Sequence, residues 1–336
     1  MTQPSGPKIV LDVHAHLAPV VAERLAELDG VDWDEAARVM HVDGHAVTMR
    51  KLFEPAELLV WMGSNNVERA WISAPPPLYR QQLRGKAARD WAGYLNQGLA
   101  AIAEESSGHL EALFHLPTQD PEVAAQIVAA GLADGHVLFS MPTGTGDDRT
   151  LGDPAFDPLW QLLDQAGAFV FMHPGECADG RLRAFYLANL LGNPYESSVA
   201  LAHLVFAGVL ERYPRMMLCL AHGGGLAPMV AGRWERGHAT ARPGVDRAIS
   251  APAQQLRNVH VDCICHSEPA ARLAEEVFGS DRVVFGSDWP FPMGLIEPHE
   301  QLRSFGAERR SRYVSGNPLR LLERLERRGK QVGKSG

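Results

Sequence analysis

The stretch Leu11–Pro19, with the sequence LDVHAHLAP, places two histidines directly after a short apolar run. The run has the character of a β-strand, and residues two apart in an extended chain point to the same side. His14 and His16 are therefore expected to converge on one point. Imidazole nitrogens are the commonest side-chain ligands for divalent transition metals, so the pair predicts half of a metal site. On its own, the pair is explained more simply as two polar residues that leave a strand.

The rest of the chain alternates between short β-type runs and helical patterns. The β-type runs number eight and cover residues 8–13, 69–73, 109–116, 136–139, 168–172, 216–220, 259–263 and 282–285. The helical patterns cover residues 55–65, 88–105, 121–132, 154–166, 196–212, 267–278 and 317–328. Strands that alternate with helices predict βαβ units and a parallel sheet. Eight such units favour a (β/α)8 TIM barrel of the α/β class, although a doubly wound open sheet gives a similar local pattern.

We expect a single domain over residues 1–336, because no low-complexity linker divides the chain. Residues 17–53 show neither a strand nor a helix pattern and are expected to form an irregular insertion after strand one. The helix over 317–328 has an apolar stripe with charged flanks, so it is expected to pack on the outside of the barrel. Residues 329–336 are expected to be a flexible tail.

Composition and charge exclude several classes of partner. The 336 residues are 46% hydrophobic and 21% charged, with a net charge of −8 and a pI near 6.0. Nothing in this balance indicates nucleic acid or an anionic membrane as a partner. The N-terminus shows no secretory h-region, and no apolar run approaches the roughly 18 residues of a membrane span. Because the four cysteines have no framework spacing, we expect free thiols and a cytoplasmic protein.

Polar residues gather at the ends of the predicted strands, where a barrel carries its active site. Beyond His14 and His16, the strand-end residues are His115, His173, His222, Asp262, His266 and Asp288. Three histidines and one aspartate suit Zn²⁺ with an open position for water, while Mn²⁺ stays possible because ligand type alone seldom decides the metal. Such an ion makes hydroxide available at neutral pH. His222 is then expected to transfer the proton.

Several segments together resemble the amidohydrolase superfamily, and within it the aminocarboxymuconate-semialdehyde decarboxylase branch. They are HAH (14–16), FMHPGE (171–176), LCLAHGGG (218–225), VDCICH (261–266) and GSDWPFPMG (286–294). From about residue 170 to 320 the resemblance is nearly continuous. Before that it rests on HAH and on the order of the strands.

The resemblance implies roles for individual residues. It implies that His14, His16, His173 and Asp288 bind one divalent metal ion and that His222 is the catalytic base beside Asp288. Arg233 would reach the substrate carboxylate of a neighbouring subunit, as a bidentate guanidinium can, which implies a homodimer. We also assign His266 to the substrate, together with Arg50 or its neighbour Lys51, because the arginine expected in the insertion has no in-register match. Where the branch has a Trp-Asp pair, this chain has Gly175 and Glu176.

We therefore predict a metal-dependent, non-oxidative decarboxylase that acts on a small unsaturated or aromatic carboxylic acid through a metal-bound water and a histidine base. A hydrolase or hydratase of the same superfamily, acting on a lactone, amide or enol acid, stays open as the alternative. A serine hydrolase is excluded, because the chain has an HGGG sequence at 222–225 but no G-x-S-x-G elbow. A non-catalytic metal-binding module is disfavoured, because His222 supplies a base.

Overall fold

Parallel strands form the centre of the molecule. The computed structural model describes residues 6–175 and 177–332, with side chains described as far as residue 327. The strands of the barrel are β1 (Asp12–His16), β5 (Ala70–Ser73), β6 (Leu110–Ala112), β7 (Phe114–His115), β8 (Leu138–Pro142), β9 (Phe169–His173), β10 (Met217–Leu220), β11 (His260–Asp262) and β12 (Val283–Val284). β6 pairs with β5 and β7 pairs with β8. These two short strands together occupy the third of the eight strand positions, or staves, of the barrel. The observed strands correspond to the eight predicted runs.

Backbone hydrogen bonds join β1 to the segment that follows the last strand, β12. The amide of Val13 donates to the carbonyl of Phe285 at 3.1 Å, directly after β12. The amide of Asp288 donates to the carbonyl of His14 at 2.7 Å, and the amide of His16 donates to the carbonyl of Trp289 at 2.8 Å. Contacts between the first and last staves are not available to an open sheet. The prediction of a TIM barrel is therefore confirmed.

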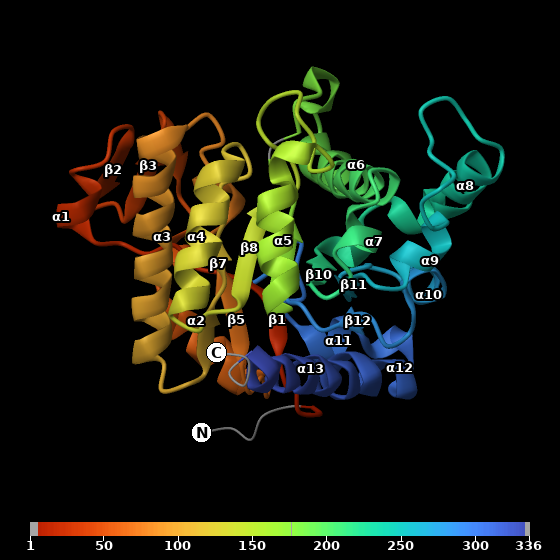
Figure 1. Cartoon of the computed structure of the whole chain (residues 1–336). Helices are drawn as coiled ribbons and strands as arrows, with labels where there is room; N and C mark the ends of the chain where they lie inside the picture. Colours follow the sequence, from red (N-terminus) through yellow and green to blue (C-terminus); the bar gives the residue numbers. More distant parts are fainter. Residues whose placement is uncertain (1–5, 176, 333–336) are drawn as a thin grey trace.

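Helices surround the strands (Figure 1). They are α1 (Ala22–Leu25), α2 (Pro55–Ser64), α3 (Gly85–Glu105), α4 (Pro121–Ala133), α5 (Asp157–Ala166), α6 (Asn193–Phe206), α7 (Val209–Arg212), α8 (Ala227–Ala239), α9 (Pro252–Leu256), α10 (Glu268–Phe278), α11 (Pro298–Gln301), α12 (Ala307–Ser311) and α13 (Asn317–Val332). Caps fix some of their starts, because side-chain oxygens bind backbone amides that the first turn leaves unpaired. Asp120 accepts from the amide of Val123, and Ser267 accepts from the amide of Ala270. No helix in the described ranges combines the length and the apolar character needed to cross a membrane.

Among the helix boundaries that differ from the sequence prediction, two change how the chain is organised. The expected helix over 196–212 is divided into α6 and α7, because Gly208 adopts a left-handed conformation with φ of +67°. Such a residue ends one helix and lets the chain start another. α13 continues to Val332 and so extends into the segment expected to be a tail. Residues 333–336 lie outside the described part of the chain.

Alternation along the strands divides the apolar core in two. Phe169 and Phe171 belong to an inner cluster, while Val170 and Met172 between them belong to the outer cluster under the helices. This is the period of two that separates the inside of a barrel from its outside. Leu321 of α13 packs into the inner cluster. The helix expected on the outside of the barrel lies across its amino-terminal end (Figure 1).

The insertion after β1 is partly ordered as a sheet, so the expectation of an irregular segment was wrong. β2 (Val31–Asp34), β3 (Val39–Val42) and β4 (His45–Val47) pair in antiparallel fashion. Asp43 and Gly44 join the last two strands with φ of +49° and +83°. A two-residue Asp-Gly turn of this kind matches the twist of a hairpin. The small sheet stands at one side of the barrel (Figure 1).

Candidate active site

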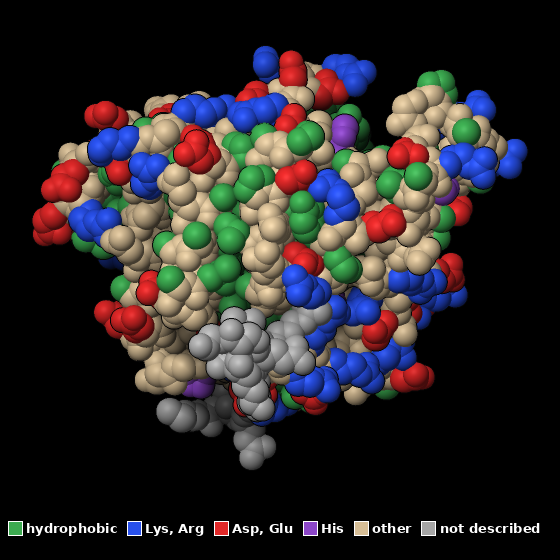
Figure 2. Space-filling view, viewed as in Figure 1, with side chains coloured by type: hydrophobic (Ala, Val, Ile, Leu, Met, Phe, Trp, Pro, Cys, Tyr) green, Lys and Arg blue, Asp and Glu red, His purple; other side chains and the backbone are tan. Residues whose placement is uncertain are grey.

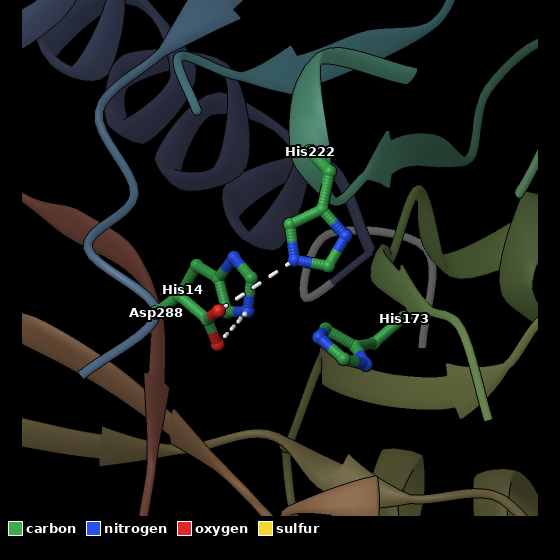
Figure 3. Close-up of side chains that lie close together, drawn as sticks. All are labelled: His14, His173, His222 and Asp288. Carbon is green, nitrogen blue, oxygen red and sulfur yellow. Dashed lines mark ion pairs between the residues drawn. The ribbon is translucent and has the colours of Figure 1, made fainter. Parts of the chain in front are cut away.

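Four side chains from four staves meet at the carboxyl ends of the strands (Figure 3). Each of His14, His173, His222 and Asp288 offers one ligand atom, and these atoms lie within 4.8 Å of one another. His16 joins this group, because its Nε2 lies 3.0 Å from Nε2 of His14 and 3.2 Å from Oδ1 of Asp288. The predicted convergence of residues on β1 and β9 and in the segments after β10 and β12 is therefore present in the structure.

The Nδ1 atoms of three histidines are engaged away from this centre. Nδ1 of His14 lies 2.7 Å from Oδ2 of Asp262, and Nδ1 of His16 lies 3.1 Å from Oγ of Ser73. Nδ1 of His173 donates to the carbonyl of its neighbour Pro174 at 2.8 Å. A histidine whose Nδ1 carries the proton has a free lone pair on Nε2. Partners of this kind orient metal-binding histidines in proteins, so the arrangement fits a metal site.

Unpaired buried atoms support the same fit. Among the described residues, the buried Nε2 of His173 and Oδ1 of Asp288 make no hydrogen bond, although Oδ1 lies 3.1 and 3.2 Å from the Nε2 atoms of His14 and His16. Leaving such atoms unpaired is costly. A divalent cation would satisfy both, and imidazole nitrogens with one carboxylate oxygen are donors that suit Zn²⁺ or Mn²⁺.

Electrostatics at the centre favour a positive charge. Burial alone would lower the pKa of His14, but the carboxylates of Asp288 and Asp262 raise it to about 10. Burial alone would raise the pKa of Asp288, but the facing His14 holds it well below its usual range. Burial also lowers the pKa of His173, and the neighbouring His16 and His14 lower it further. The two carboxylates are thus placed to stabilise positive charge at this centre.

Asp12 and Ser287 set the position of Asp288, and the sequence interpretation gave neither of them a role. Oδ1 of Asp12 accepts from the amides of His14 and Ser287, at 3.0 and 2.9 Å, and Oδ2 accepts from the hydroxyl of Ser287 at 2.5 Å. Burial raises the pKa of Asp12 to about 7, against the opposing effect of the Ser287 hydroxyl. An aspartate within a buried strand, two residues before His14, is the signal that could have indicated this contact.

A glycine run presents His222 at the end of β10. Cβ atoms on Gly224 and Gly225 would lie 2.8 Å from the Phe278 ring and 2.3 Å from the Pro194 carbonyl oxygen, so neither position accepts a larger residue. His222 itself has φ of +56°, and Asp288 has φ of +58°. Such conformations are strained for residues other than glycine and concentrate at functional sites. The His222 side chain is 16% exposed, and its Nε2 lies 3.6 Å from Oδ2 of Asp288.

A comparison with known proteins agrees with this arrangement. The amidohydrolase family profile matches residues 11–324, which is most of the chain. The chain belongs to the amidohydrolase family. The match covers all the residues of the strand-end cluster.

Relatives of this amidohydrolase include decarboxylases. A 2-amino-3-carboxymuconate-6-semialdehyde decarboxylase of Dictyostelium discoideum is 28% identical, with 93% of this chain and 91% of the relative covered. The 5-carboxyvanillate decarboxylase of Sphingomonas paucimobilis has a similar structure, with a TM-score of 0.78, 21% identity and coverage of 94% and 98%. A dihydroxybenzoic acid decarboxylase of Polaromonas, solved with bound manganese, has a TM-score of 0.76, 18% identity and coverage of 94% and 97%. The resemblance to the decarboxylase branch is thereby confirmed.

The three predicted substrate contacts of this amidohydrolase lie in different places. His266 is near the cluster. Partial burial lowers its pKa, and the neighbouring His222 lowers it further. Arg50 is exposed in the 3-10 turn Arg50–Phe53, and Arg233 is exposed on α8. No hydrogen bond or ion pair within the described part of the chain joins either arginine to the histidines. Glu176, at the departure from the branch pattern, lies outside the described residues.

Proposed function

We propose that this amidohydrolase is a metal-dependent, non-oxidative decarboxylase of a small unsaturated or aromatic carboxylic acid. The observation that carries the proposal is the cluster of inward-facing imidazoles and one carboxylate beside the more exposed His222. The similarity to an aminocarboxymuconate-semialdehyde decarboxylase over 93% of the chain supports the same reaction. No organic cofactor is needed for it.

We assign the metal to His14, His16, His173 and Asp288, with Zn²⁺ as the expected ion and Mn²⁺ as the second candidate. The bound manganese of the Polaromonas relative supports the second candidate. When bound, the ion supplies positive charge that polarises a substrate oxygen. His222 also lies within ligand distance of this group. We place it outside the ligand set because its side chain is 16% exposed, whereas those of His14 and His16 are fully buried.

His222 would transfer a proton to the substrate carbon. Loss of carbon dioxide breaks a carbon–carbon bond and leaves the electron pair on the substrate carbon, which must then take a proton. His222 projects from the end of β10 with its Nε2 toward Asp288, so it can hold a proton at that atom and deliver it to the carbon. The imidazole regains the proton from solvent, to which the side chain is partly open. This exchange returns the site to its starting state.

A homodimer is the second part of the proposal, and an exposed apolar surface supports it. α8 and the loop that follows it project from the body of the molecule (Figures 1 and 2). Met229 on this helix is 76% exposed, and Arg233 follows one turn later on the same face. Large exposed apolar side chains continue on the neighbouring segment: Phe185, Tyr186, Leu190, Leu191 and Tyr195. The amide of Leu226 donates to the carbonyl of Pro194, which joins the two segments.

Apolar side chains gathered in this way mark interaction surfaces. A second copy that covers this surface would bring its own Arg233 toward the neighbouring site, where a guanidinium can hold the substrate carboxylate. The cytoplasmic location expected from the sequence stays a prediction.

The reaction is tested with a panel of aromatic and muconic acids incubated with metal-loaded protein. Release of carbon dioxide with formation of the decarboxylated product is the expected result. Ring opening or water addition without carbon dioxide release would instead assign the protein to the hydrolase or hydratase class. A metal-free preparation of the same protein serves as the control for spontaneous decarboxylation.

A further inference from the structure

Three neighbouring strands end in buried polar atoms that the described residues leave without a partner. On β9 the atom is Nε2 of His173, which the proposed metal would engage. On β7 both ring nitrogens of His115 are unpaired, and after β8 the hydroxyl of Thr143 is unpaired. β8 pairs with β7 on one side and with β9 on the other. The unpaired atoms therefore follow one arc of the barrel mouth, from the candidate metal site outward.

The His115 side chain is held firmly in this arc. Its residue is 1% exposed, and the Asn96 side chain clamps its backbone by accepting from the amide at 2.6 Å and donating to the carbonyl at 3.2 Å. The Tyr79 ring stacks on the imidazole with centroids 5.3 Å apart and an angle of 14° between the planes. Tyr79 in turn lies 6.5 Å from the His173 ring, centroid to centroid. The stacked pair thus begins beside a candidate metal ligand.

The arc is electrically neutral. Burial lowers the pKa of His115 to about 4, so the imidazole is uncharged near pH 7. Tyr79 is a phenol and carries no charge near pH 7. The guanidinium of Arg80, the next residue, is bound to both carboxylate oxygens of Asp43 at 2.9 and 2.7 Å. This arginine is therefore not directed at a second carboxylate in the arc.

We propose that His115, Tyr79 and Thr143 form a recognition wall for a neutral hydrogen-bonding substituent of the substrate, such as a hydroxyl or amino group. A neutral imidazole offers one donor and one acceptor, and each hydroxyl offers both. A second carboxylate is disfavoured there, because a buried charge needs a charged or strongly donating partner. The inference rests on the proposed function, since the reacting carboxylate would lie at the metal centre.

The test is calorimetric binding of substituted benzoates to the metal-loaded protein, without turnover. The compounds carry a hydroxyl, methyl or second carboxylate group at each ring position in turn. At one ring position, the benzoate that carries a hydroxyl is expected to bind about 10- to 100-fold more tightly than the one that carries a methyl group. The benzoate with a second carboxylate at that position is expected to bind most weakly. His115→Phe retains a ring against Tyr79 but removes both nitrogens, so it should abolish the preference for hydroxyl over methyl. His115→Gln, which restores a donor and an acceptor, should recover part of it.

His260→Phe is the matched control. This histidine is also buried, but it begins β11 at the opposite end of the barrel. The substitution should leave the hydroxyl preference unchanged, and unfolding temperatures will show that both variants fold. A hydroxyl preference that persists in His115→Phe would overturn the proposal. The His115 nitrogens would then not be the groups that recognise the hydroxyl, and bound water alone would satisfy them in the parent protein. Tightest binding of the dicarboxylates would also overturn it. Since no turnover is measured, an absence of decarboxylation would refute the proposed function and leave the recognition wall standing.

Discussion

Nδ1 of His14 lies 2.7 Å from Oδ2 of Asp262, although the two residues are 248 positions apart in the chain. Both side chains are fully buried. The other carboxylate oxygen of Asp262 accepts from the amides of Gly223 and Ile264, at 2.9 and 3.0 Å. Burial alone would raise the pKa of Asp262, but the hydrogen bond with His14 lowers it. One carboxylate therefore directs Nε2 of His14 toward the candidate metal site and holds the turn after His222.

Replacing this carboxylate should weaken metal binding. Asp262→Asn is expected to reduce the affinity for Zn²⁺ by about 10- to 100-fold, because the tautomer of His14 is no longer fixed. Competition with a chromogenic chelator measures the affinity. Asp281→Asn makes the same chemical change at an exposed aspartate and should have no effect. Equal affinities for the Asp262 variant and the parent would contradict the role given to this contact.

His222 and His16 should respond differently to substitution. His222→Asn is expected to keep the metal and to lose about 10²- to 10⁴-fold in turnover, because the proton donor is removed. His16→Asn is expected to lose the metal. Elemental analysis and steady-state kinetics of the two purified variants check this. If the His222 variant were the one to lose the metal, the two roles would have to be exchanged.

Removal of the metal should abolish activity reversibly. Dialysis against a strong chelator is expected to leave a folded, inactive protein, since the barrel core does not depend on the ion. Addition of Zn²⁺ or Mn²⁺ should restore turnover, and the more active ion identifies the working metal. Circular dichroism before and after dialysis serves as the control for folding. Full activity in the presence of the chelator would contradict a metal-dependent reaction.

Arg233 should act across a subunit boundary. Arg233→Ala is expected to be inactive, and mixing it with inactive His222→Ala should recover some activity, because a hybrid dimer contains one complete site. Arg272→Ala, an exposed arginine on α10 whose side chain is 58% exposed, is the control and should stay active. Sedimentation across a range of protein concentrations gives the oligomeric state. A fully active monomer would refute the shared site.

Buried neutral histidines should make the fold sensitive to acid. Burial lowers the pKa of His115 to about 4 and that of His260 to about 3, both from 6.5. The unfolded chain therefore binds more protons below pH 6.5, so stability is full above that pH and falls as pH decreases toward 4. Each histidine should contribute roughly 1.4 kcal/mol per pH unit in this window. Urea unfolding of His260→Phe between pH 7 and 4.5 should show a shallower loss than the parent. Parallel curves for the two proteins would contradict this assignment.

Much of the fold could be predicted because its signals are local. The eight strand runs and most helices follow from periods of two and 3.6 residues. The small sheet of the insertion was missed even though Asp43-Gly44 is a strong hairpin signal, because its strands are short and lack a long apolar pattern. The position of α13 could not be predicted, because an amphipathic helix fits the outside or the end of a barrel equally well. Only the contact of Leu321 with the inner cluster decided between them.

For the candidate site, the sequence by itself determined which chemical groups are available: imidazoles and a carboxylate at the ends of strands, with a glycine run after His222. Those features depend on residue type and on neighbours a few positions away. The tertiary structure alone decided which atoms face one another, including the pairing of His14 with Asp262 and the unpaired ring of His115. The physical reason is that these contacts join distant staves, so their geometry exists only once the barrel has closed.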